Sequence, residues 1–454
     1  MANDAFHQEL EQVGRGLETK AQWAVEQALK AGADECVVSV SNASGIDVST
    51  RRMKTENVTF NKNRSMGIVV YRNKKSGTAS TTDLEKQSIA DCIEAAVRIA
   101  DNTDPDPCAG ICDKEDLCTE VKDFGLTYPM FADIDQAVEL TAALEDDALS
   151  RKDPRIKDTD GAYFGSWIKS RVLATSNGFC QVQTGSSHSF GLTLIGESDG
   201  RMQRGGGFST APDFEGLSAG KVVVDEAMEE TLGRLNARKP RTGRYNVIFT
   251  KNAARSLWSH LRAAISGRSI YLQSSFLCGR LGTQILPSFI TIHEDPHVYR
   301  EPGSRSFDSE GAATFAQDWV KDGVLQEYLL SSYSARKLGL RTNAHSGGIG
   351  TVYFKADAEH QKSLEELMAM AGEGLVIDQA IGQGVDIVSG NYSRGASGFY
   401  FKDGRRQYAV QEFTVAANLK DLYLQIAALG TDIDERFRYK AGSILIPDLA
   451  VSAA

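Results

Sequence analysis

Apolar residues in the first hundred positions follow two different periods. Between residues 6 and 30 they recur every three or four positions, as on one helix face, and Gly32 can serve as the C-cap. Thr82 and Glu85 have capping-box spacing, which predicts a second helix that reaches about Ala100. Between these helices, polar turns with Gly or Asn separate four short alternating runs, which predict strands at 36–40, 45–51, 57–61 and 66–72.

The mixture of helical and alternating periods continues to the C-terminus. The pattern predicts a helix at 133–149, then five short strands between 159 and 209, and then a helix at 217–235. A strand at 245–249 leads into a helix at 252–265, and short strands with Gly-rich turns follow. We therefore expect an α+β protein with largely antiparallel, hairpin-connected sheets.

A basic stretch with Pro and Gly at residues 237–244 interrupts this pattern. Polar segments of this kind are typical of linkers between domains. The 454 residues are also enough for two or three domains of the usual size. We expect a mixed α/β N-terminal domain at residues 1–238 and a β-rich C-terminal domain at residues 239–454.

Composition and charge narrow the classes of function. The chain has 50 Lys and Arg against 60 Asp and Glu, a net charge of −10 that argues against direct nucleic-acid binding. Its start lacks a signal-peptide pattern, and no apolar run approaches the roughly 20 residues of a membrane span. Seven Cys, an odd and sparse set, are typical of reduced thiols. These features predict a cytoplasmic protein that binds neither nucleic acid nor a membrane.

The string His293-Glu294-Asp295-Pro296-His297 has the H-E-x-x-H letters of zinc proteases. In those enzymes the motif lies on a helix, which places both His on one face beside the bound water. Pro296 disfavours a helix interior, and the preceding residues 289–292 favour a strand. We therefore predict the polar end of a strand here.

A second string, Gly196-Glu197-Ser198-Asp199-Gly200, has the G-x-S-x-G letters of a nucleophile elbow. That elbow requires a helix directly after the serine, and the residues after it predict none. Asp-Gly is a common hairpin dipeptide, so a hairpin turn explains the string. An independent hydrolase centred on Ser198, or on the His293/His297 pair, stays as an alternative.

The second half of the chain also contains stretches that resemble those of a known protein family. The most specific is a Gly-rich run from Gly382 that ends in Ser393-Arg394-Gly395-Ala396-Ser397-Gly398-Phe399 and is followed by residues 418–421. Further stretches lie at 235–245, 263–277, 281–287 and 307–311. Together they resemble the PmbA/TldE branch of the TldD/PmbA family, peptidase family U62, also called "modulator of DNA gyrase".

The resemblance implies a zinc metalloprotease complex that cleaves unfolded peptides. TldD-type subunits of this family carry an H-E-x-x-x-H helix and a late Cys ligand, and they pair with TldE-type subunits that lack the zinc site. The matching helix here retains His260, but Leu261 replaces the Glu and Ile265 replaces the second His. The late Cys position falls near 441–442, and no Cys follows Cys278.

The resemblance therefore implies a non-catalytic TldE/PmbA-like subunit of a cytoplasmic complex that degrades or processes unfolded peptides. This chain would bind no cofactor, and zinc would lie in a TldD-type partner; a homodimer of the chain alone stays open as an alternative. Asn391, Arg394, Gly395 and Gly398 are the substrate-channel candidates, for a peptide bound by strand addition. The Gly-rich run equally fits tight hairpin turns. A binding protein that contacts gyrase is a further alternative.

Overall fold

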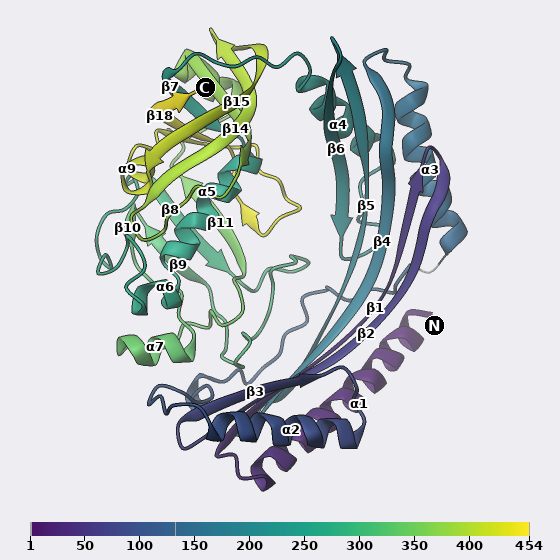
Figure 1. Cartoon of the computed structure of the whole chain (residues 1–454), viewed down its shortest axis with the longest axis vertical. Helices are drawn as coiled ribbons and strands as arrows, with labels where there is room; N and C mark the ends of the chain where they lie inside the picture. The colour runs from purple at the N-terminus through teal and green to yellow at the C-terminus, as the bar shows by residue number, and fades with distance from the viewer. Residues whose placement is uncertain (1, 132, 454) are drawn as a thin grey trace.

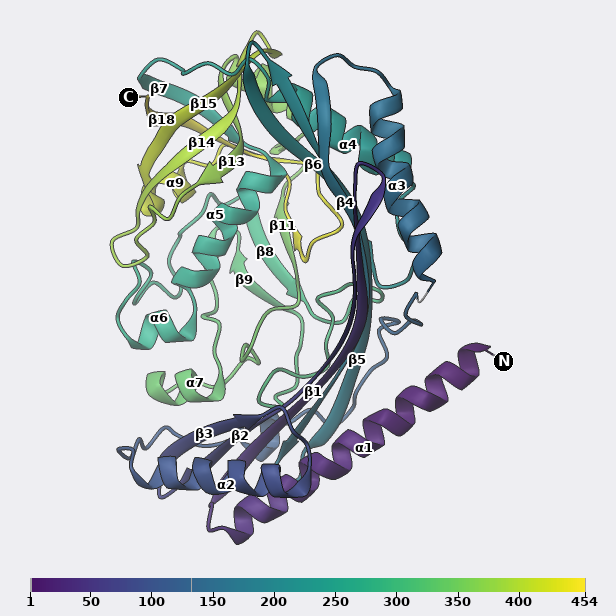
Figure 2. The ribbon, with the colours of Figure 1, turned by 45° about the vertical axis from the view of Figure 1, so that its right-hand side comes forward.

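The structure is a computed structural model that describes residues 2–131 and 133–453. The first half of the chain builds one long antiparallel sheet with the strand order β3-β2-β1-β4-β5-β6. Figures 1 and 2 show this sheet curving around the second half of the chain. Its strands are β1 (Glu35–Arg51), β2 (Lys54–Arg72), β3 (Lys75–Thr81), β4 (Ile156–Thr175), β5 (Cys180–Ser198) and β6 (Arg201–Ala211).

Helices cover the outer, convex face of this sheet (Figure 1). They are α1 (Ala2–Lys30), α2 (Lys86–Asp101), α3 (Ile134–Ser150) and α4 (Gly220–Gly233). Alternate residues of β1 explain the arrangement, because Val38 and Val40 pack in the core with α1 and α2. Farther along β1, Ile46 and Val48 pack in a second core with α3 and α4. β1 and β4 thus contribute to two successive cores.

The prediction of many short strands in this half is wrong. β1 and β2 run for 17 and 19 residues, and β4 and β5 for 20 and 19, through positions that the sequence pattern assigns to turns. Residues 41–44, which the pattern assigns to a turn, run on without a break into Gly45, the first residue of the predicted strand at 45–51, and the Trp167 ring from β4 lies over that glycine. A Cβ at Gly45 would lie only 2.2 Å from that ring. The glycine is required for packing inside a continuous strand and does not make a turn.

The predicted capping box before α2 is also wrong. The helix begins at Lys86, and its N-cap residue Glu85 makes no side-chain capping hydrogen bond. Asp83 instead accepts hydrogen bonds from the Glu85 N–H at 3.0 Å and the Ser88 hydroxyl at 2.5 Å. The acidic side chain between the two predicted capping residues stabilises this turn.

The second half of the chain contains two further sheets. A five-stranded sheet has the order β10-β9-β8-β11-β17, and a seven-stranded sheet has the order β12-β16-β18-β15-β14-β13-β7. An additional pairing of β18 with β7 closes part of the larger sheet on itself. Most pairings are antiparallel, which confirms the predicted α+β class.

The elements of this half are short except for four strands, which have 9 to 14 residues, and one helix of 14 residues. Its strands are β7 (Gly243–Phe249), β8 (Ile290–Asp295), β9 (Gln317–Lys321), β10 (Val324–Leu325), β11 (Thr351–Ala356), β12 (Gln361–Lys362), β13 (Glu373–Ile381), β14 (Asn391–Lys402), β15 (Arg405–Asn418), β16 (Ala428–Gly430), β17 (Tyr439–Lys440) and β18 (Ile444–Ser452). Its helices are α5 (Lys251–Ala264), α6 (Gly267–Tyr271), α7 (Ser332–Leu338), α8 (Leu364–Ala371) and α9 (Leu419–Leu424).

Helix α5 lies in the main core of the second half, and this packing positions the candidate site. Its buried face includes Leu257 and Trp258, and the Trp258 ring stacks on Phe354 of β11 with ring centres 4.5 Å apart. Tyr423 of α9 adds a hydrogen bond from its hydroxyl to the Leu257 carbonyl at 2.7 Å. The helix is therefore fixed against both sheets.

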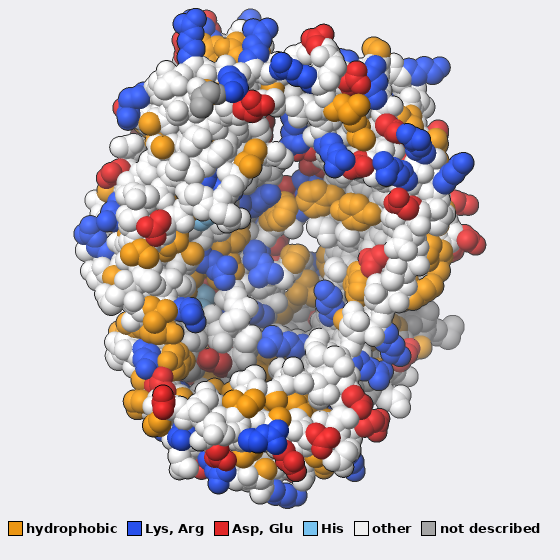
Figure 3. Space-filling view, viewed as in Figure 1, with side chains coloured by type: hydrophobic (Ala, Val, Ile, Leu, Met, Phe, Trp, Pro, Cys, Tyr) orange, Lys and Arg blue, Asp and Glu red, His pale blue; other side chains and the backbone are white. Residues whose placement is uncertain are grey.

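The two halves contact each other through apolar side chains, as in the cluster of Leu173, Phe179 and Phe307, and through polar side chains. Arg436 donates to Glu226 of α4 at 2.7 Å, and the Tyr333 hydroxyl of α7 donates to Asp106 at 2.7 Å. Figure 3 shows the molecule hollowed at its centre, between the halves, with Lys and Arg side chains gathered around the opening. We call this space the central hollow. The division at residues 238 and 239 stays a prediction.

In the described part of the chain, no helix combines the length and apolar character that crossing a membrane requires. The cytoplasmic location stays a prediction.

Candidate functional site

His260 lies near the C-terminal end of α5, partly buried against β14. Its ring contacts the Tyr392 ring edge to face, with ring centres 6.2 Å apart. The Nε2 atom is buried and has no hydrogen-bond partner among the described residues. Burial, with a smaller effect from the Arg394 charge, lowers the pKa of His260 to about 4. The imidazole is therefore neutral at pH 7.

Arg394, a predicted channel residue, lies beside this imidazole. Its guanidinium donates to the Ser256 hydroxyl at 2.7 Å and to the Ala380 carbonyl at 2.7 Å. Ser256 precedes His260 by one helical turn, so the two bonds hold the guanidinium against α5. The structure thus brings together His260 and Arg394. Sequence analysis missed Ser256 and Tyr392, which carry no motif of their own.

The other two positions of the zinc motif belong to the core. Leu261 is 1% exposed and Ile265 is fully buried, and both pack in the main cluster of the second half. Ile265 follows the last residue of α5, and its N–H donates to the Leu261 carbonyl at 3.0 Å. A carboxylate or imidazole at these places would be buried among apolar side chains.

The segment at residues 434–442 faces α5 and includes the place of the late Cys ligand. Arg255 of α5 stacks over the Phe437 ring at 3.6 Å from its centre and lies 3.8 Å from Asp434. At Gly442, a Cβ would lie 1.9 Å from the Gly430 carbonyl oxygen. A cysteine side chain at Gly442 does not fit this backbone.

These observations test whether the site fits a catalytic zinc ion. Such an ion needs three protein ligands and a water. Of the positions that the resemblance assigns to zinc chemistry, only His260 offers a donor atom. Over residues 2–131 and 133–453, no group of three His, Cys, Asp or Glu side chains could hold a metal ion. The donor set at the positions around His260 does not fit catalytic zinc.

Cationic groups surround the site. Hydrogen bonds to Asp434, and also to Glu226, raise the pKa of Arg436 above its ordinary value. Burial lowers the pKa of Arg255, which Asp434 only partly offsets. Both guanidiniums lie between α5 and the first half of the chain, consistent with the basic side chains around the central hollow in Figure 3. Two carboxylates, Asp434 and Glu226, balance these two guanidiniums.

The H-E-x-x-H string lies on β8 and the turn after it, as predicted. Neighbouring residues of a strand point to opposite faces, so the His and Glu of the string separate. His293 contacts Asp318 of β9 at 2.7 Å, whereas His297 stacks on Phe124 from the first half with ring centres 5.7 Å apart. The two imidazoles have different partners and do not form the helical arrangement of a zinc site.

Glu294 from the same string forms a buried polar cluster. It accepts hydrogen bonds from His345 at 2.7 Å, from Trp319 at 2.8 Å and from the Gly350 N–H. Burial raises the pKa of Glu294, but these hydrogen bonds and the His345 charge outweigh it and leave the pKa below its ordinary value. The other His345 nitrogen contacts the Asn343 amide oxygen at 2.9 Å. This cluster links β8 to β9 and to residues 343–350.

Ser198 is the last residue of β5, where the chain turns directly into β6. Asp199 and Gly200 both have positive φ, 52° and 74°, as in the tight turns that join antiparallel strands. A strand and not a helix follows the serine. The geometry of a nucleophile elbow is therefore not formed around Ser198.

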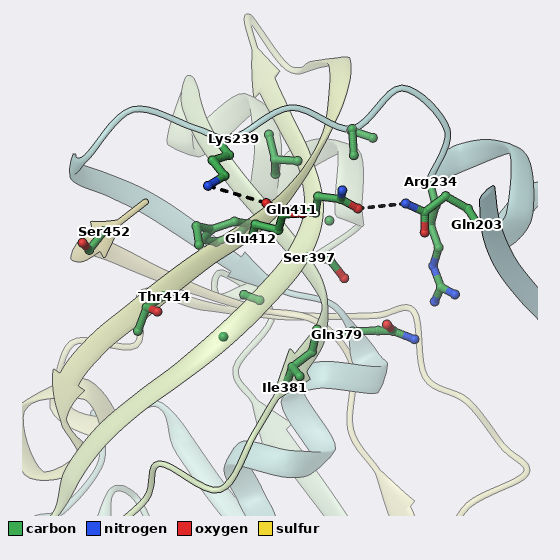
Figure 4. A pocket seen from close by; sticks show the side chains of 17 residues that line it. Gln203, Arg234, Lys239, Gln379, Ile381, Ser397, Gln411, Glu412, Thr414 and Ser452 are labelled. Carbon is green, nitrogen blue, oxygen red and sulfur yellow. Dashed lines mark hydrogen bonds and ion pairs between the residues drawn. The ribbon is translucent and has the colours of Figure 1, made fainter. Parts of the chain in front are cut away.

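Gly395 and Gly398 of β14 line a cavity of about 630 Å³ beside the linker between the halves. Figure 4 shows its polar rim, where Gln203 donates to Gln411 at 2.8 Å and Lys239 lies 3.6 Å from Glu412. A Cβ at Gly398 would lie 1.8 Å from the Val376 carbonyl oxygen, so close strand packing requires this glycine. No such close contact constrains Gly395.

Asn391, the remaining channel candidate, does not line this cavity. Its amide oxygen accepts a hydrogen bond from Asn418 at 3.2 Å, where β14 begins and β15 ends. Arg394 points to α5 and not into the cavity. The four predicted channel residues therefore lie in three places along β14, of which Arg394 alone contacts the residues around His260.

Comparison with known proteins places this geometry in a family. Family models described as PmbA/TldA metallopeptidase domain 1, central domain and C-terminal domain match residues 36–100, 131–235 and 242–453. Metalloprotease PmbA of Escherichia coli O157:H7 is 41% identical over 436 residues, which cover 96% of each chain. The chain belongs to the PmbA/TldD metallopeptidase family. This confirms the family resemblance of the sequence.

Solved structures of the PmbA/TldD family share the whole fold. A protein named as a modulator of DNA gyrase from Bacteroides thetaiotaomicron has a TM-score of 0.90 at 23% identity, covering 96% of this chain and 98% of that one. TldE from Thermococcus kodakarensis has a TM-score of 0.81 at 19% identity, covering 96% of this chain and all of that one. A metal is expected in this family, whereas the positions around His260 supply only one ligand.

Proposed function

We propose that this chain is a non-catalytic, TldE/PmbA-like subunit of a cytoplasmic zinc metalloprotease complex that degrades or processes unfolded peptides. The observation that carries the proposal is the burial of Leu261 and Ile265 in the core. The resemblance assigns the catalytic glutamate and the second zinc ligand to these positions. Without them His260 holds no zinc, so the zinc of the complex lies in a TldD-type partner.

The role of this chain would be to hold the peptide. Arg394 is fixed by Ser256 and the Ala380 carbonyl, so its guanidinium is positioned before any ligand arrives. Next to it, the buried Nε2 of the neutral His260 has no partner among the described residues. An extended peptide offers carbonyl oxygens and amide N–H groups to such residues. We propose that Arg394 and His260 contact the substrate, with Asn391, Gly395 and Gly398 along the same strand.

A reconstitution experiment tests this function. The purified chain, a TldD-type subunit and their mixture are each assayed on an unfolded peptide. We expect cleavage by the mixture and none by this chain alone. In the mixture, Arg394→Ala is expected to raise KM with little change in kcat, because it removes a binding group and no chemical group. Arg405→Ala, an exposed arginine on the β14–β15 hairpin, is the matched control.

Stoichiometric zinc and full cleavage by the isolated chain would overturn the proposal. If Ser198→Ala or His293→Ala then abolished that activity, the independent hydrolase would replace it. Retention of gyrase subunits by the purified chain, without effect on peptide cleavage, would instead support the gyrase-binding alternative.

A further inference from the structure

The concave face of the six-stranded sheet carries two aromatic side chains from the middle of β4. Neighbouring residues of a strand point to opposite faces, and Phe164 packs in the convex core with α3 and α4. Tyr163 and Trp167 therefore point to the concave face. At the far end of the same strand face, Leu173 packs in one cluster with Phe307 of the second half. Tyr163 stays 45% exposed and Trp167 partly exposed, so this stretch of β4 faces the central hollow.

Both aromatic rings lie over glycines of the neighbouring strands. Trp167 pairs with Gly45 of β1, and Tyr163 pairs with Gly191 of β5. A Cβ at Gly45 would lie within 2.7 Å of indole atoms Cδ2, Cε3 and Cε2, and a Cβ at Gly191 would lie 2.6 Å from Tyr163 Cε1. Because the nearest indole atoms include the two carbons that its rings share, one face of the indole covers Gly45. The opposite face of the indole is therefore turned to the hollow.

The indole is fixed before any ligand arrives. Its Nε1 donates to Asp47 at 3.0 Å, and Asn61 of β2 donates to the other oxygen of that carboxylate at 2.9 Å. The exposed Lys169 places its amine 5.7 Å from the indole centre, near the outer limit of a cation–π contact. A contact this long, on a flexible side chain, is readily exchanged for a ligand that stacks on the ring. The ring face is thus positioned and available for binding.

The aromatic surface continues toward the helix that carries the peptide site. Phe208 of β6 pairs with Gly191, so it lies in the same cross-strand row as Tyr163. The Phe437 ring contacts Phe208 edge to face, with ring centres 5.9 Å apart. Arg255 of α5 stacks over Phe437 at 3.6 Å from its ring centre. A continuous line of side chains therefore joins the concave face to α5.

The chemistry of this surface favours flat, apolar groups. Figure 3 shows apolar side chains inside the opening of the hollow, among the Lys and Arg side chains. Pairs of aromatic rings stabilise each other beyond the burial of their area. Large aromatic residues are mostly buried in folded proteins and become accessible when a chain unfolds. A surface that binds aromatic rings therefore distinguishes unfolded peptides from folded proteins.

We propose that Trp167 and Tyr163 form an aromatic platform that binds aromatic side chains of the unfolded peptide. The proposal rests on the proposed function, because it names the class of peptide that the complex takes. A Phe, Tyr or Trp of the peptide stacks on the indole face, and the rest of the peptide extends toward α5 and Arg394. The platform thus selects peptides by side chain, whereas pairing with the backbone of a strand is independent of sequence.

Peptide binding to the isolated full-length chain tests the platform without a catalytic partner. The probes are two short Gly/Ser-rich peptides that differ only in one central residue, Phe or Ala, and titration calorimetry measures Kd. Wild type is expected to bind the Phe peptide more tightly on the order of 10-fold. Tyr163→Ser and Trp167→Leu should remove most of this preference, whereas Trp167→Phe, which keeps a ring, should retain most of it.

Tyr299→Ser is the matched control. Tyr299 is also exposed, at 66%, but it lies beside Gly125 and lines a cavity with α1. Its substitution should leave the preference for the Phe peptide unchanged. Equal binding of the two peptides by wild type would overturn the proposal. So would a loss of preference in Tyr299→Ser as large as that in Tyr163→Ser.

Two features of the experiment keep its outcomes separate. Trp167→Leu leaves a gap over Gly45, but Tyr163 is 45% exposed, so Tyr163→Ser is expected to keep the fold and to decide the test. Cleavage by the mixture with a TldD-type subunit tests the proposed function itself. If that mixture does not cleave while the wild-type chain still prefers the Phe peptide, the proposed function fails and the platform stands.

Discussion

Helix α5 and strand β8 each carry part of a zinc-protease motif, and neither carries all of it. α5 has the helical geometry and the first histidine, His260, but apolar side chains at the other positions. β8 has the letters His293, Glu294 and His297, but as a strand that runs into a turn. A metal-binding motif requires a particular geometry as well as particular residue types. Here the two requirements are met in different places.

The comparison also shows what the unused positions do instead. On α5, Leu261 and Ile265 join the core. On β8, Glu294 is 2% exposed and is held by His345 and Trp319, so its carboxylate stabilises packing between strands. Both regions contribute to stability, one through apolar burial and the other through a buried polar cluster. Substitutions should separate these two contributions.

The largest expected loss of stability follows from a substitution on β8. Glu294→Ala leaves His345 and the Trp319 N–H buried without their partner, which should reduce the free energy of unfolding by about 3–5 kcal/mol. His293→Ala on the same strand is the control. Its half-exposed pair with Asp318 contributes at most about 1 kcal/mol. Urea unfolding at pH 7 measures both, and equal losses would contradict the buried cluster as the stabilising group.

A smaller, pH-dependent effect is expected on α5. The unfolded chain protonates His260 as pH falls through the ordinary imidazole pKa of 6.5, whereas burial in the folded chain lowers this pKa to about 4. The folded state therefore loses stability relative to the unfolded state across that window. Between pH 7.5 and 5, wild type should lose about 2 kcal/mol more than His260→Gln.

Urea unfolding at the two pH values measures this difference. The matched control is His7→Gln, because His7 is exposed on α1 and should leave the pH dependence of wild type unchanged. A parallel loss of stability in wild type and His260→Gln would show that the α5 imidazole is not buried in the neutral form.

The smallest change in stability is expected from a substitution at the β5–β6 turn. Ser198→Ala should change the free energy of unfolding by less than about 0.5 kcal/mol, because the serine ends a strand at a hairpin and packs in no core. Peptide cleavage by the mixture with a TldD-type subunit should be unchanged in a fixed-time assay. Loss of cleavage by a folded Ser198→Ala variant would favour the independent hydrolase centred on Ser198 over a non-catalytic role for this chain.

Local pattern predicted the helices and the class of the fold, but not the length of the strands. The pattern assigns residues 41–44 to a turn, whereas in the structure they continue β1 into Gly45, which pairs with Asn61 of β2 and Trp167 of β4. Strand continuity there depends on a contact between residues far apart in the chain. The same is true of Asp83, which replaces the predicted capping box before α2.

The candidate site was predictable to the extent that a motif marks it. The family motif identified His260 and the apolar residues at the other two motif positions, and Pro296 indicated that the H-E-x-x-H string is not a helix. No local signal joins Arg394 to Ser256 or Glu294 to His345, because each pair comes from separate elements. The extent of β3 likewise depends on the assembled sheet, in which it pairs only with residues 66–72 of β2.

Zinc content of the separated subunits tests the central claim most directly. This chain and a TldD-type subunit are purified together, separated and analysed for metal. The account predicts about one zinc per TldD-type subunit and none bound by this chain, since a catalytic ion needs three protein ligands. Stoichiometric zinc in this chain, lost on His260→Ala, would contradict the account.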